Sequence, residues 1–306
     1  MLGNIVDRMK DKHNNTNLSM NTNINIAELE LTGACELNCR FCYNRILKQK
    51  EIRQNYVDED GVKTFLSTIK KIPSIKEVGL YGLGESTLHP YLAKYYKMMK
   101  EAGYFTYLTT NGINTTHLIP AIKYIDSLKF SWNYKDENDF HAKTGADHKT
   151  MYTILSNINN IYQLFSNITD ISISVVLDIG DQVSDFKYML SKIKCKNVFF
   201  VPVLTQGGIY RAGKTGGPNI VEDGFKKSMP CWTLFKGLYV DCELNVRTCP
   251  YGNDDNKQYT HILGNLKKDS LEDILKERDK YKQMHLNGDC PIICKKCLKE
   301  DQEEGD

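Results

Sequence analysis

Short stretches rich in β-branched and aromatic residues alternate, from residue 26 to residue 203, with longer stretches whose apolar residues recur every three or four positions. The short stretches predict buried strands and the longer ones predict amphipathic helices. Six strands are predicted, at 27–31, 77–81, 104–109, 127–132, 171–177 and 197–203. Five helices are predicted between them, at 58–72, 91–102, 115–124, 149–165 and 184–193. This order belongs to the α/β class and predicts a parallel (β/α)6 arrangement with crossover helices.

The regions on either side of this alternation have a different character. Residues 1–24 are polar and rich in Asn, without hydrophobic periodicity, and are predicted to be a mobile tail. The glycines that follow the sixth strand, up to Pro218, mark a boundary, so the main domain is predicted at 25–218. Residues 229–299 hold six of the ten cysteines and are predicted to be a small domain that is organised by metal more than by a core. The acidic residues 300–306 are predicted to be a solvated tail.

Composition and charge exclude several classes of partner. The chain has 306 residues, of which 41% are hydrophobic, so it can bury a large core. Its 40 basic and 38 acidic residues are mixed along the sequence, and we therefore expect no nucleic-acid partner. No apolar run approaches the roughly 18 residues of a membrane helix, and the N-terminus has no apolar signal core. We therefore expect a cytoplasmic protein without a membrane partner, in which grouped cysteines bind metal more often than they form disulfides.

The first cysteine group lies directly after the first predicted strand. Cys35, Cys39 and Cys42 have the spacing C-x3-C-x2-C on one tight loop. Thiolates are typical ligands of zinc and of iron–sulfur clusters. Three protein ligands leave one iron of a four-iron cluster open, and an open metal position allows a small molecule to bind and react. Active groups of parallel barrels lie at the C-terminal ends of strands, which favours an active site here, although a zinc knuckle would use the same residue types.

This spacing, with the aromatic Phe41 before the third cysteine, resembles the signature of the radical S-adenosylmethionine (SAM) superfamily. The resemblance implies a partial, TIM-like (β/α)6 barrel whose cluster binds SAM through its amino and carboxylate groups. It also implies that an electron from the cluster cleaves SAM to a 5′-deoxyadenosyl radical, which removes a substrate hydrogen. The segment 81–85 is similar to the Gly-Gly-Glu segment of the family, which implies SAM contacts from Gly84 and Glu85. Leu83 departs from that pattern, because it replaces the first glycine of the usual pair.

The resemblance implies further SAM contacts at the ends of the third and fourth strands. Asn111 lies in Thr-Thr-Asn-Gly, which is similar to a Thr-Asn-Gly segment of the family. Ser131 and Asn133 lie where contacts to the SAM ribose and carboxylate are commonly made. Lys143 occupies about the place where many relatives have a basic residue that faces the SAM carboxylate. The alternatives are an ordinary turn at Asn111 and an ordinary strand residue at Ser131.

The second cysteine group lies in the predicted small domain. Its four members are Cys231, Cys249, Cys294 and Cys297. They are separated by 17, 44 and 2 residues. Strands predicted at 237–241 and 245–248 would bring the first two together, and a helix is predicted at 271–281 before the last two. Four thiolates close a site, for either zinc or a four-iron cluster.

Together with the first motif, this group resembles the SPASM/twitch C-terminal domain of radical SAM enzymes, as does Gly-Asn-Leu at 264–266. The number of cysteines implies the twitch form, with one auxiliary four-iron cluster in addition to the cluster that binds SAM. Cys242 and Cys290 are unassigned, and either can replace a chosen ligand or belong to a second, incomplete site. Cys195 is predicted to be a small buried hydrophobic residue.

A second cluster implies where the electron goes after hydrogen abstraction. A substrate radical that loses a proton and passes one electron to the cluster has undergone a two-electron oxidation, so we expect an oxidoreductase of the dehydrogenase type. Tyr43 and Arg211 are the candidates for orienting the substrate. Relatives that modify peptides often carry an N-terminal recognition domain, whereas a polar tail precedes the first strand here, so we expect a carbohydrate-like or other small-molecule substrate. Peptide modification and a zinc-binding protein without turnover are the alternatives. By analogy with the family, the expected reductant is a flavodoxin or ferredoxin.

Overall fold

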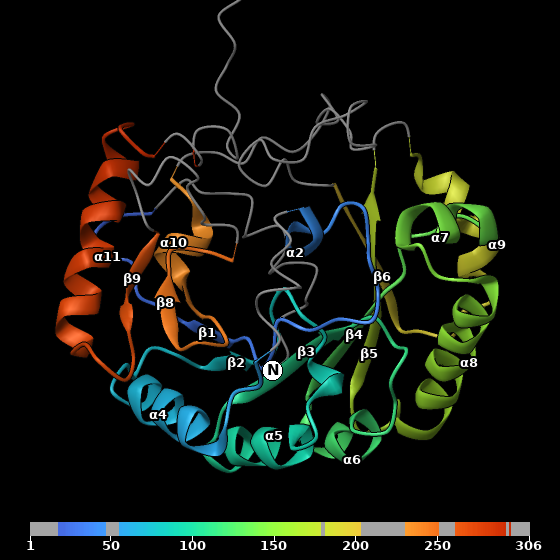
Figure 1. The fold of residues 1–306 in the computed structure, drawn as a ribbon, viewed down its shortest axis with the longest axis horizontal. Helices are drawn as coiled ribbons and strands as arrows, with labels where there is room; N and C mark the ends of the chain where they lie inside the picture. The colour runs from blue at the N-terminus through green and yellow to red at the C-terminus, as the bar shows by residue number, and fades with distance from the viewer. Residues whose placement is uncertain are drawn as a thin grey trace, which may run out of the picture.

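Nine strands form one continuous sheet in the computed structural model, which describes residues 18–46, 55–178, 181–202, 230–250, 261–291 and 294. Along the sheet the strands follow the order β6-β5-β4-β3-β2-β1-β7-β8-β9 (Figure 1). The first six are β1 (Ile26–Leu29), β2 (Glu77–Gly79), β3 (Phe105–Thr110), β4 (Ser127–Ser131), β5 (Asp170–Leu177) and β6 (Asn197–Pro202). Each of these is parallel to its neighbours in the series. The predicted fold class, a partial (β/α)6 barrel, is confirmed.

The helices between these strands cover the outer side of the arc of strands in Figure 1. They are α4 (Glu59–Lys70), α5 (Leu92–Glu101), α6 (Leu118–Ala121) with the 3-10 turn η2 (Ile122–Tyr124), α8 (His148–Phe165), and η3 (Val183–Phe186) with α9 (Lys187–Leu190). Each lies within a stretch predicted as helical or begins one residue before it. Capping side chains set where two of them begin: Asp58 accepts from Gly61 N–H at 2.7 Å, and Asp147 accepts from Thr150 N–H at 2.8 Å.

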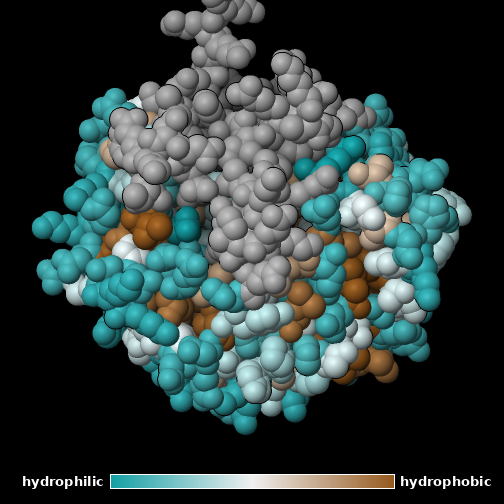
Figure 2. All heavy atoms as spheres, in the orientation of Figure 1, coloured by the Kyte–Doolittle hydropathy of each residue, from teal (hydrophilic) through white to brown (hydrophobic). Residues whose placement is uncertain are grey.

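Apolar side chains between the sheet and its helices form one continuous core. Leu29 of β1, Phe65 of α4, Tyr96 of α5 and Ile158 of α8 are all fully buried in it. On the face shown in Figure 2, hydrophilic residues cover most of the periphery, and most of the visible hydrophobic residues lie further inside. Removal of this apolar surface from water is the main driving force that holds the helices on the sheet.

The C-terminal part extends the same sheet. Its elements are α10 (Trp232–Lys236), β7 (Gly237–Val240), β8 (Asn245–Arg247), β9 (Ile262–Asn265) and α11 (Leu271–Leu286). β7 pairs in parallel with β1, and β8 and β9 follow in antiparallel order. Phe235, Val240 and Val246 are buried in the core that the barrel also forms. This part therefore shares both a sheet and a core with the barrel, and its organisation by metal stays a prediction.

Several short elements have no counterpart in the sequence prediction. They are α2 (Tyr43–Ile46), η1 (Ser86–Leu88), α7 (Glu137–Thr144), α10 and β9. The α7 helix shows no hydrophobic period because Phe140 is its only large buried apolar residue. Its ends carry the signal instead, since Asp136 accepts from Asp139 N–H at 2.8 Å and Gly145 ends the helix with a φ of 73°.

Residues 18–24, which were predicted as part of the N-terminal tail, contact the C-terminal helix. Lys282 Nζ of α11 donates to Met20 O at 2.5 Å, and Ile24 is buried. The rest of that tail, the glycine-rich stretch before Pro218 and the acidic end lie outside the described residues. In the part of the chain that the structure describes, no helix combines the length and the apolar character that crossing a membrane requires.

Candidate active site

The cysteine loop, residues 32–42, follows the C-terminal end of β1 and carries the first cysteine group. Cys35, Cys39 and Cys42 are each partly buried. Cys42 N–H donates to Cys39 O at 3.0 Å, which closes a turn around the last two cysteines. Thr32 Oγ1 accepts from Ala34 N–H at 3.1 Å at the start of the loop. The three thiols therefore lie on a compact loop at the C-terminal edge of the parallel strands.

The segment after β2 packs directly against this loop. Glu85 N–H donates to Ala34 O at 2.7 Å. Gly84 makes the approach possible, because a Cβ atom there would lie 2.0 Å from Thr32 O and 2.8 Å from Ala34 O. Both neighbours are backbone atoms, so a side chain at Gly84 would require the loop to move. The glycine that resembles the family segment is thus a packing requirement of the cysteine loop.

The Glu85 side chain joins the ends of β2 and β3. Its carboxylate accepts from Thr87 N–H at 3.0 Å, from the Thr87 and Thr110 hydroxyls at 2.8 Å each, and from Asn111 N–H at 2.8 Å. Burial raises the pKa of this carboxyl group, and the hydrogen bonds from the Asn111 and Thr87 amides oppose that effect. Both carboxylate oxygens are therefore used within the protein, and the contact to the SAM ammonium stays a prediction.

Asn111 lies at the end of β3 beside the cysteine loop. Its Nδ2 donates to Glu36 Oε2 at 3.2 Å and lies 3.9 Å from Cys35 Sγ. Its Oδ1 accepts from Ile113 N–H at 2.9 Å, and Gly112 has a φ of 81°. The turn that was one alternative is therefore present at Asn111, and the contact of Asn111 with SAM stays a prediction.

The surroundings of Cys35 favour the protonated form of its thiol. Burial, followed by the Glu85 carboxylate, raises the pKa of the Cys35 thiol to about 12, and the Cys42 thiol adds to this rise. Metal coordination has the opposite effect, because a coordinating thiol is deprotonated. Among the described residues no three Cys, His, Asp or Glu side chains converge around a single metal ion. Three soft thiolates on one loop still suit a cluster, which distributes its ligands over several irons.

Ser131 and Asn133 lie where β4 meets β5. Ser131 is partly buried and pairs in register with Ser174. Asn133 is buried, and its Oδ1 accepts from Val176 N–H at 2.8 Å. The Asn133 amide thus continues the pairing of the two strands, and a SAM contact from either residue stays a prediction.

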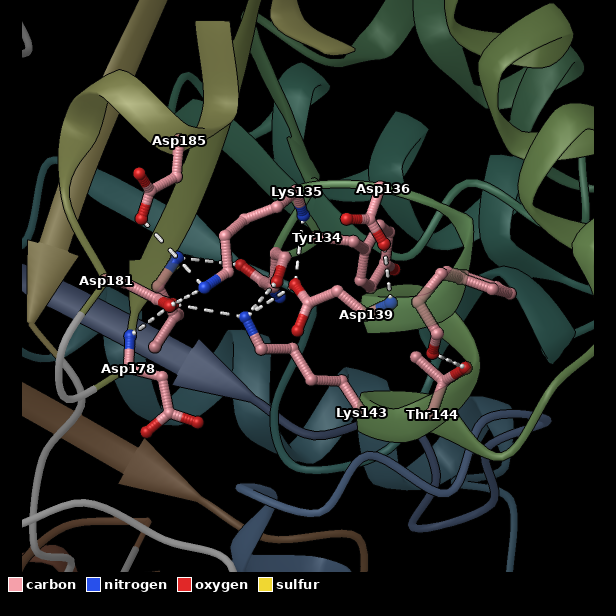
Figure 3. Close-up of polar contacts among 12 residues, drawn as sticks. Tyr134, Lys135, Asp136, Asp139, Lys143, Thr144, Asp178, Asp181 and Asp185 are labelled. Carbon is pink, nitrogen blue, oxygen red and sulfur yellow. Dashed lines mark hydrogen bonds and ion pairs between the residues drawn. The ribbon is translucent and has the colours of Figure 1, made fainter. Parts of the chain in front are cut away.

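Lys143, in the last turn of α7, is 1% exposed. Its ammonium contacts Asp139 Oδ2 at 2.9 Å, Asp181 Oδ2 at 3.1 Å and Asn133 O at 3.0 Å (Figure 3). Three oxygen acceptors use the three N–H donors of an ammonium group. The structure therefore places Lys143 in a network inside the protein, and its predicted contact with the SAM carboxylate stays a prediction.

The two residues that follow the third cysteine are buried. Phe41 is partly buried, and Tyr43, the first residue of α2, is 2% exposed. Asn44, which the sequence analysis does not single out, donates through Nδ2 to Gly33 O at 2.7 Å and so ties α2 to the start of the cysteine loop. The predicted substrate contact of Tyr43 stays a prediction.

Three of the four predicted auxiliary ligands belong to the described residues. Cys231 precedes α10, and Cys249 follows β8, whose antiparallel register places its end beside the start of β7. His285 Nδ1, in the last turn of α11, accepts from Cys231 N–H at 3.4 Å, and Cys294 follows that helix. Burial, together with His261, lowers the pKa of His285 to about 4, so its imidazole is neutral and can accept. The start of α10 and the end of α11 thus approach each other at Cys231.

The remaining cysteines differ in burial. Cys242 and Cys290 are buried, whereas Cys195, which was predicted to be buried, is only partly buried and packs against the core. The fourth predicted ligand, Cys297, and the candidate Arg211 lie outside the described residues.

Two carboxylates of the first strand segment were missed by the sequence analysis. Glu28 Oε1 accepts from the hydroxyls of Tyr81 and Tyr107, at 2.9 Å each. Glu30 Oε2 accepts from Tyr239 OH of β7 at 2.5 Å. The signal was available, because two Glu residues alternate with apolar residues and therefore point to the side of the sheet opposite the helices.

A parallel barrel with three cysteines after its first strand, and a cysteine-bearing extension of the same sheet, suits an iron–sulfur enzyme. The sequence model of the Radical SAM superfamily matches residues 29–193, more than half of the chain, and the chain therefore belongs to that superfamily. The model of SPASM, an iron–sulfur cluster-binding domain, matches residues 231–298. The first domain thus binds a 4Fe–4S cluster and SAM, and the second binds auxiliary iron–sulfur.

Solved structures share this fold. BtrN, in complex with AdoMet and 2-DOIA, has a TM-score of 0.56 and 17% identity, over 90% of this chain and 93% of BtrN. The enzyme anSMEcpe with bound AdoMet has a TM-score of 0.60 and 10% identity, over 85% and 83%. SuiB of Streptococcus suis, bound to precursor peptide SuiA, has a TM-score of 0.55 and 14% identity, over 90% and 70%.

Curated relatives match over shorter stretches. The tungsten-containing aldehyde ferredoxin oxidoreductase cofactor-modifying protein of Pyrococcus furiosus is 30% identical over 84 residues, which is 28% of this chain and 23% of the relative. A relative from Methanocaldococcus jannaschii is 23% identical over 151 residues, 49% of this chain and 56% of the relative. The matches therefore span less than two thirds of either relative.

Proposed function

We propose that this radical SAM enzyme oxidises a carbohydrate-like or other small-molecule substrate, with one auxiliary cluster as the electron acceptor. The observation that carries the proposal is that both cysteine regions are built on one sheet. β7, which begins six residues after Cys231, pairs in parallel with β1, which leads into the cysteine loop. The bond from Tyr239 OH to Glu30 also crosses this junction. A fixed relation between the two regions suits transfer of an electron between their clusters.

The cofactors are assigned to the two cysteine groups. Cys35, Cys39 and Cys42 would hold the cluster that binds SAM. The auxiliary cluster is assigned to Cys231, Cys249, Cys294 and Cys297 from the spacing of these cysteines in the sequence. When bound, these groups supply a 5′-deoxyadenosyl radical and an acceptor for the remaining electron. The chain's task is then to bind the substrate, orient it and exclude water.

The inner side of the sheet offers polar groups that support a hydroxylated substrate. Glu28, Tyr81 and Tyr107 form a hydrogen-bonded group there. Gly79 leaves room for it, because a Cβ atom at Gly79 would lie 2.7 Å from the Tyr81 ring and 2.8 Å from the Tyr107 ring. Phenol hydroxyls donate and accept, and a carboxylate accepts, which matches the alternating donors and acceptors of a polyol. Tyr43 and Arg211 remain the candidates for orienting the substrate.

Peptide modification is the second candidate function. SuiB was solved with the precursor peptide SuiA, and anSMEcpe with the Cp18Cys peptide, at TM-scores of 0.55 and 0.59 to this chain. BtrN, solved with 2-DOIA, supports the small-molecule proposal. The matches to two cluster-binding families favour both enzyme proposals over a zinc-binding protein without turnover.

The test is a substrate screen with the anaerobically reconstituted protein, SAM and dithionite. Amino sugars, cyclitols and other polyols are compared with cysteine-containing peptides, and 5′-deoxyadenosine is measured together with product mass. We expect a small molecule to lose two hydrogens in step with deoxyadenosine formation. Loss of two hydrogens, or a new crosslink, in peptides alone would contradict the small-molecule proposal.

A matched pair of variants tests the role of the auxiliary site. Cys294→Ala removes a proposed auxiliary ligand, so we expect deoxyadenosine to form while the oxidised product falls by about 100-fold. Cys195→Ala changes a cysteine outside both groups and is expected to retain the product. Equal product from both variants would contradict an electron-accepting role for the auxiliary site.

The proposal extends to the partner and the location of the enzyme. A flavodoxin or ferredoxin is proposed as the reductant, because a low-potential electron donor is required to reduce the first cluster. A cytoplasmic location is proposed because thiolates that bind clusters must stay reduced.

A further inference from the structure

The cysteine loop rests on the C-terminal end of α7. Arg40 N–H donates to Lys143 O at 2.7 Å, and Asn38 N–H donates to Thr144 O at 3.2 Å. The last carbonyl groups of a helix have no partner within the helix, so an outside donor must satisfy them. Here the amides on either side of Cys39 do so, and the position of this part of the loop is therefore tied to α7.

The Arg40 side chain provides a second anchor. Its Nη2 donates to Asp178 Oδ2 at 2.6 Å, and the Asp178 side chain, directly after β5, is only 9% exposed. A charged hydrogen bond of this kind is among the stronger polar contacts in proteins. Since Arg40 stands between Cys39 and Cys42, the pair ties the turn that bears two cysteines to the end of β5.

A buried charge network lies behind both anchors (Figure 3). Asp181, whose side chain is 4% exposed, accepts from Asp178 N–H at 2.9 Å, and it pairs with Lys135 at 2.6 Å and with Lys143 at 3.1 Å. Burial raises the pKa of Asp181, but the hydrogen bonds and charges of the two lysines outweigh it and lower that pKa. The two anchors of the loop, at Lys143 O and at Asp178, are thus linked to each other through one carboxylate.

We propose that Arg40, Asp178, Asp181 and Lys143 form a positioning network that sets where Cys39 and Cys42 present their thiolates to the cluster. Arg40 acts on the turn directly, Asp178 acts through Arg40, and Lys143 acts through its carbonyl oxygen and Asp181. The four residues come from the loop, α7 and the segment after β5, so the network joins elements that are far apart in sequence. The inference rests on superfamily membership and is independent of the substrate proposed above.

The test uses the reconstituted full chain and the variant Asp178→Asn, which keeps the side-chain shape and removes the charge that Arg40 contacts. Asp170→Asn is the matched control, because Asp170 lies at the other end of β5 and pairs with the exposed Lys196. The readouts are iron content, the electron paramagnetic resonance spectrum of the reduced protein with and without SAM, and the Kd for SAM. Residues that support metal ligands typically change metal affinity or activity by about 10- to 100-fold. We expect about tenfold weaker SAM binding and an altered SAM-induced spectrum for Asp178→Asn, and no change for Asp170→Asn.

Arg40 variants keep the test decisive if Asp178→Asn fails to fold. The Arg40 side chain is 30% exposed, so Arg40→Gln removes the pair from its less buried side. We expect Arg40→Gln to weaken SAM binding as Asp178→Asn does. Arg40→Lys retains the charge, so we expect its affinity for SAM to lie between those of Arg40→Gln and the unaltered protein. The proposal would be overturned if both Arg40→Gln and Asp178→Asn had a Kd for SAM within twofold of the unaltered protein and showed the same SAM-induced change in the spectrum. Absence of any SAM-induced change in the unaltered protein would contradict the superfamily activity itself, which is a separate and recognisable outcome.

Discussion

The two cysteine regions of this chain are built in opposite ways. The cysteine loop gathers three thiols within eight residues, yet its position depends on bonds to distant segments, such as Glu85 N–H to Ala34 O and Arg40 to Asp178. The C-terminal group spreads its described thiols from Cys231 to Cys294, and the hairpin and helix that carry it are packed into the common core. The compact cysteine loop is thus held in place by contacts from distant segments, whereas the elements that carry the dispersed cysteines are themselves packed into the core. Substitutions near the loop should therefore affect the first cluster selectively.

The largest effect of this kind is expected for Gly84→Ala. The new Cβ atom would lie 2.0 Å from Thr32 O, and only a backbone shift of the cysteine loop relieves this contact. We expect the free energy of unfolding to fall by about 3 kcal/mol. Urea denaturation of the cluster-free protein measures this change, and iron analysis after reconstitution should show loss mainly from the first cluster.

Gly103→Ala is the control for a glycine-to-alanine change. Gly103 has a φ of 88°, but a Cβ atom there would meet nothing within 4 Å. Only backbone strain remains, which costs about 1–2 kcal/mol. Equal losses from the two variants, with unchanged iron, would contradict the packing role of Gly84.

Tyr239→Phe should have an intermediate effect and tests the junction between the two regions. It removes the hydroxyl that donates to Glu30 Oε2 and leaves the ring in place. A hydrogen bond to a charged group contributes about 1.5–3 kcal/mol, so we expect unfolding to become easier by about 2 kcal/mol. Tyr188→Phe is the control, because Tyr188 is 67% exposed. A loss for Tyr239→Phe no larger than for this control would show that the hydroxyl does not hold the junction.

The smallest effect is a pH dependence at His89, near the end of the segment that follows β2. His89 Nδ1 accepts from Tyr91 N–H at 3.2 Å and Nε2 faces Val57 O at 3.0 Å, so the ring is neutral with its proton on Nε2. Burial lowers the pKa of His89 below its usual 6.5. Below pH 6.5 the unfolded chain therefore binds a proton that the folded chain does not. His89 contributes stability above about pH 6.5, and this contribution declines as the pH falls.

The expected slope is at most about 1.4 kcal/mol per pH unit below pH 6.5. Urea denaturation at pH 7.5 and pH 5.5 measures it, with His89→Gln as the comparison, since a Gln amide also donates to Val57 O but does not titrate. A difference between the two pH values that is the same in His89→Gln would assign the pH dependence to other groups.

The parts of the fold that were predicted from sequence are those with a local signal. β5 and α8 show regular apolar patterns, and the structure places them at Asp170–Leu177 and His148–Phe165, within one residue of the predicted bounds. α7 was missed because one buried Phe140 makes no period, although Asp136 and Gly145 mark its ends.

The candidate site divides in the same way. The spacing of Cys35, Cys39 and Cys42 is a local signal, because it can be recognised from one short stretch of the sequence. Lys143 has one local partner, Asp139 four residues earlier, but Asp181 lies 38 residues further along the chain, and the sequence prediction for Lys143 rested on its place alone. Periodicity and motif spacing do not predict which distant residues will pair with a buried charge.

Iron and sulfide content, measured with 5′-deoxyadenosine formation after anaerobic reconstitution, tests the central claim most directly. The unaltered protein is compared with the variant Cys35→Ala/Cys39→Ala/Cys42→Ala in the presence of SAM and dithionite. Two four-iron clusters predict about eight irons in the former and about four in the latter, with deoxyadenosine only from the former. Zinc in place of iron, or deoxyadenosine from the triple variant, would contradict the assignment of the SAM-binding cluster to this loop.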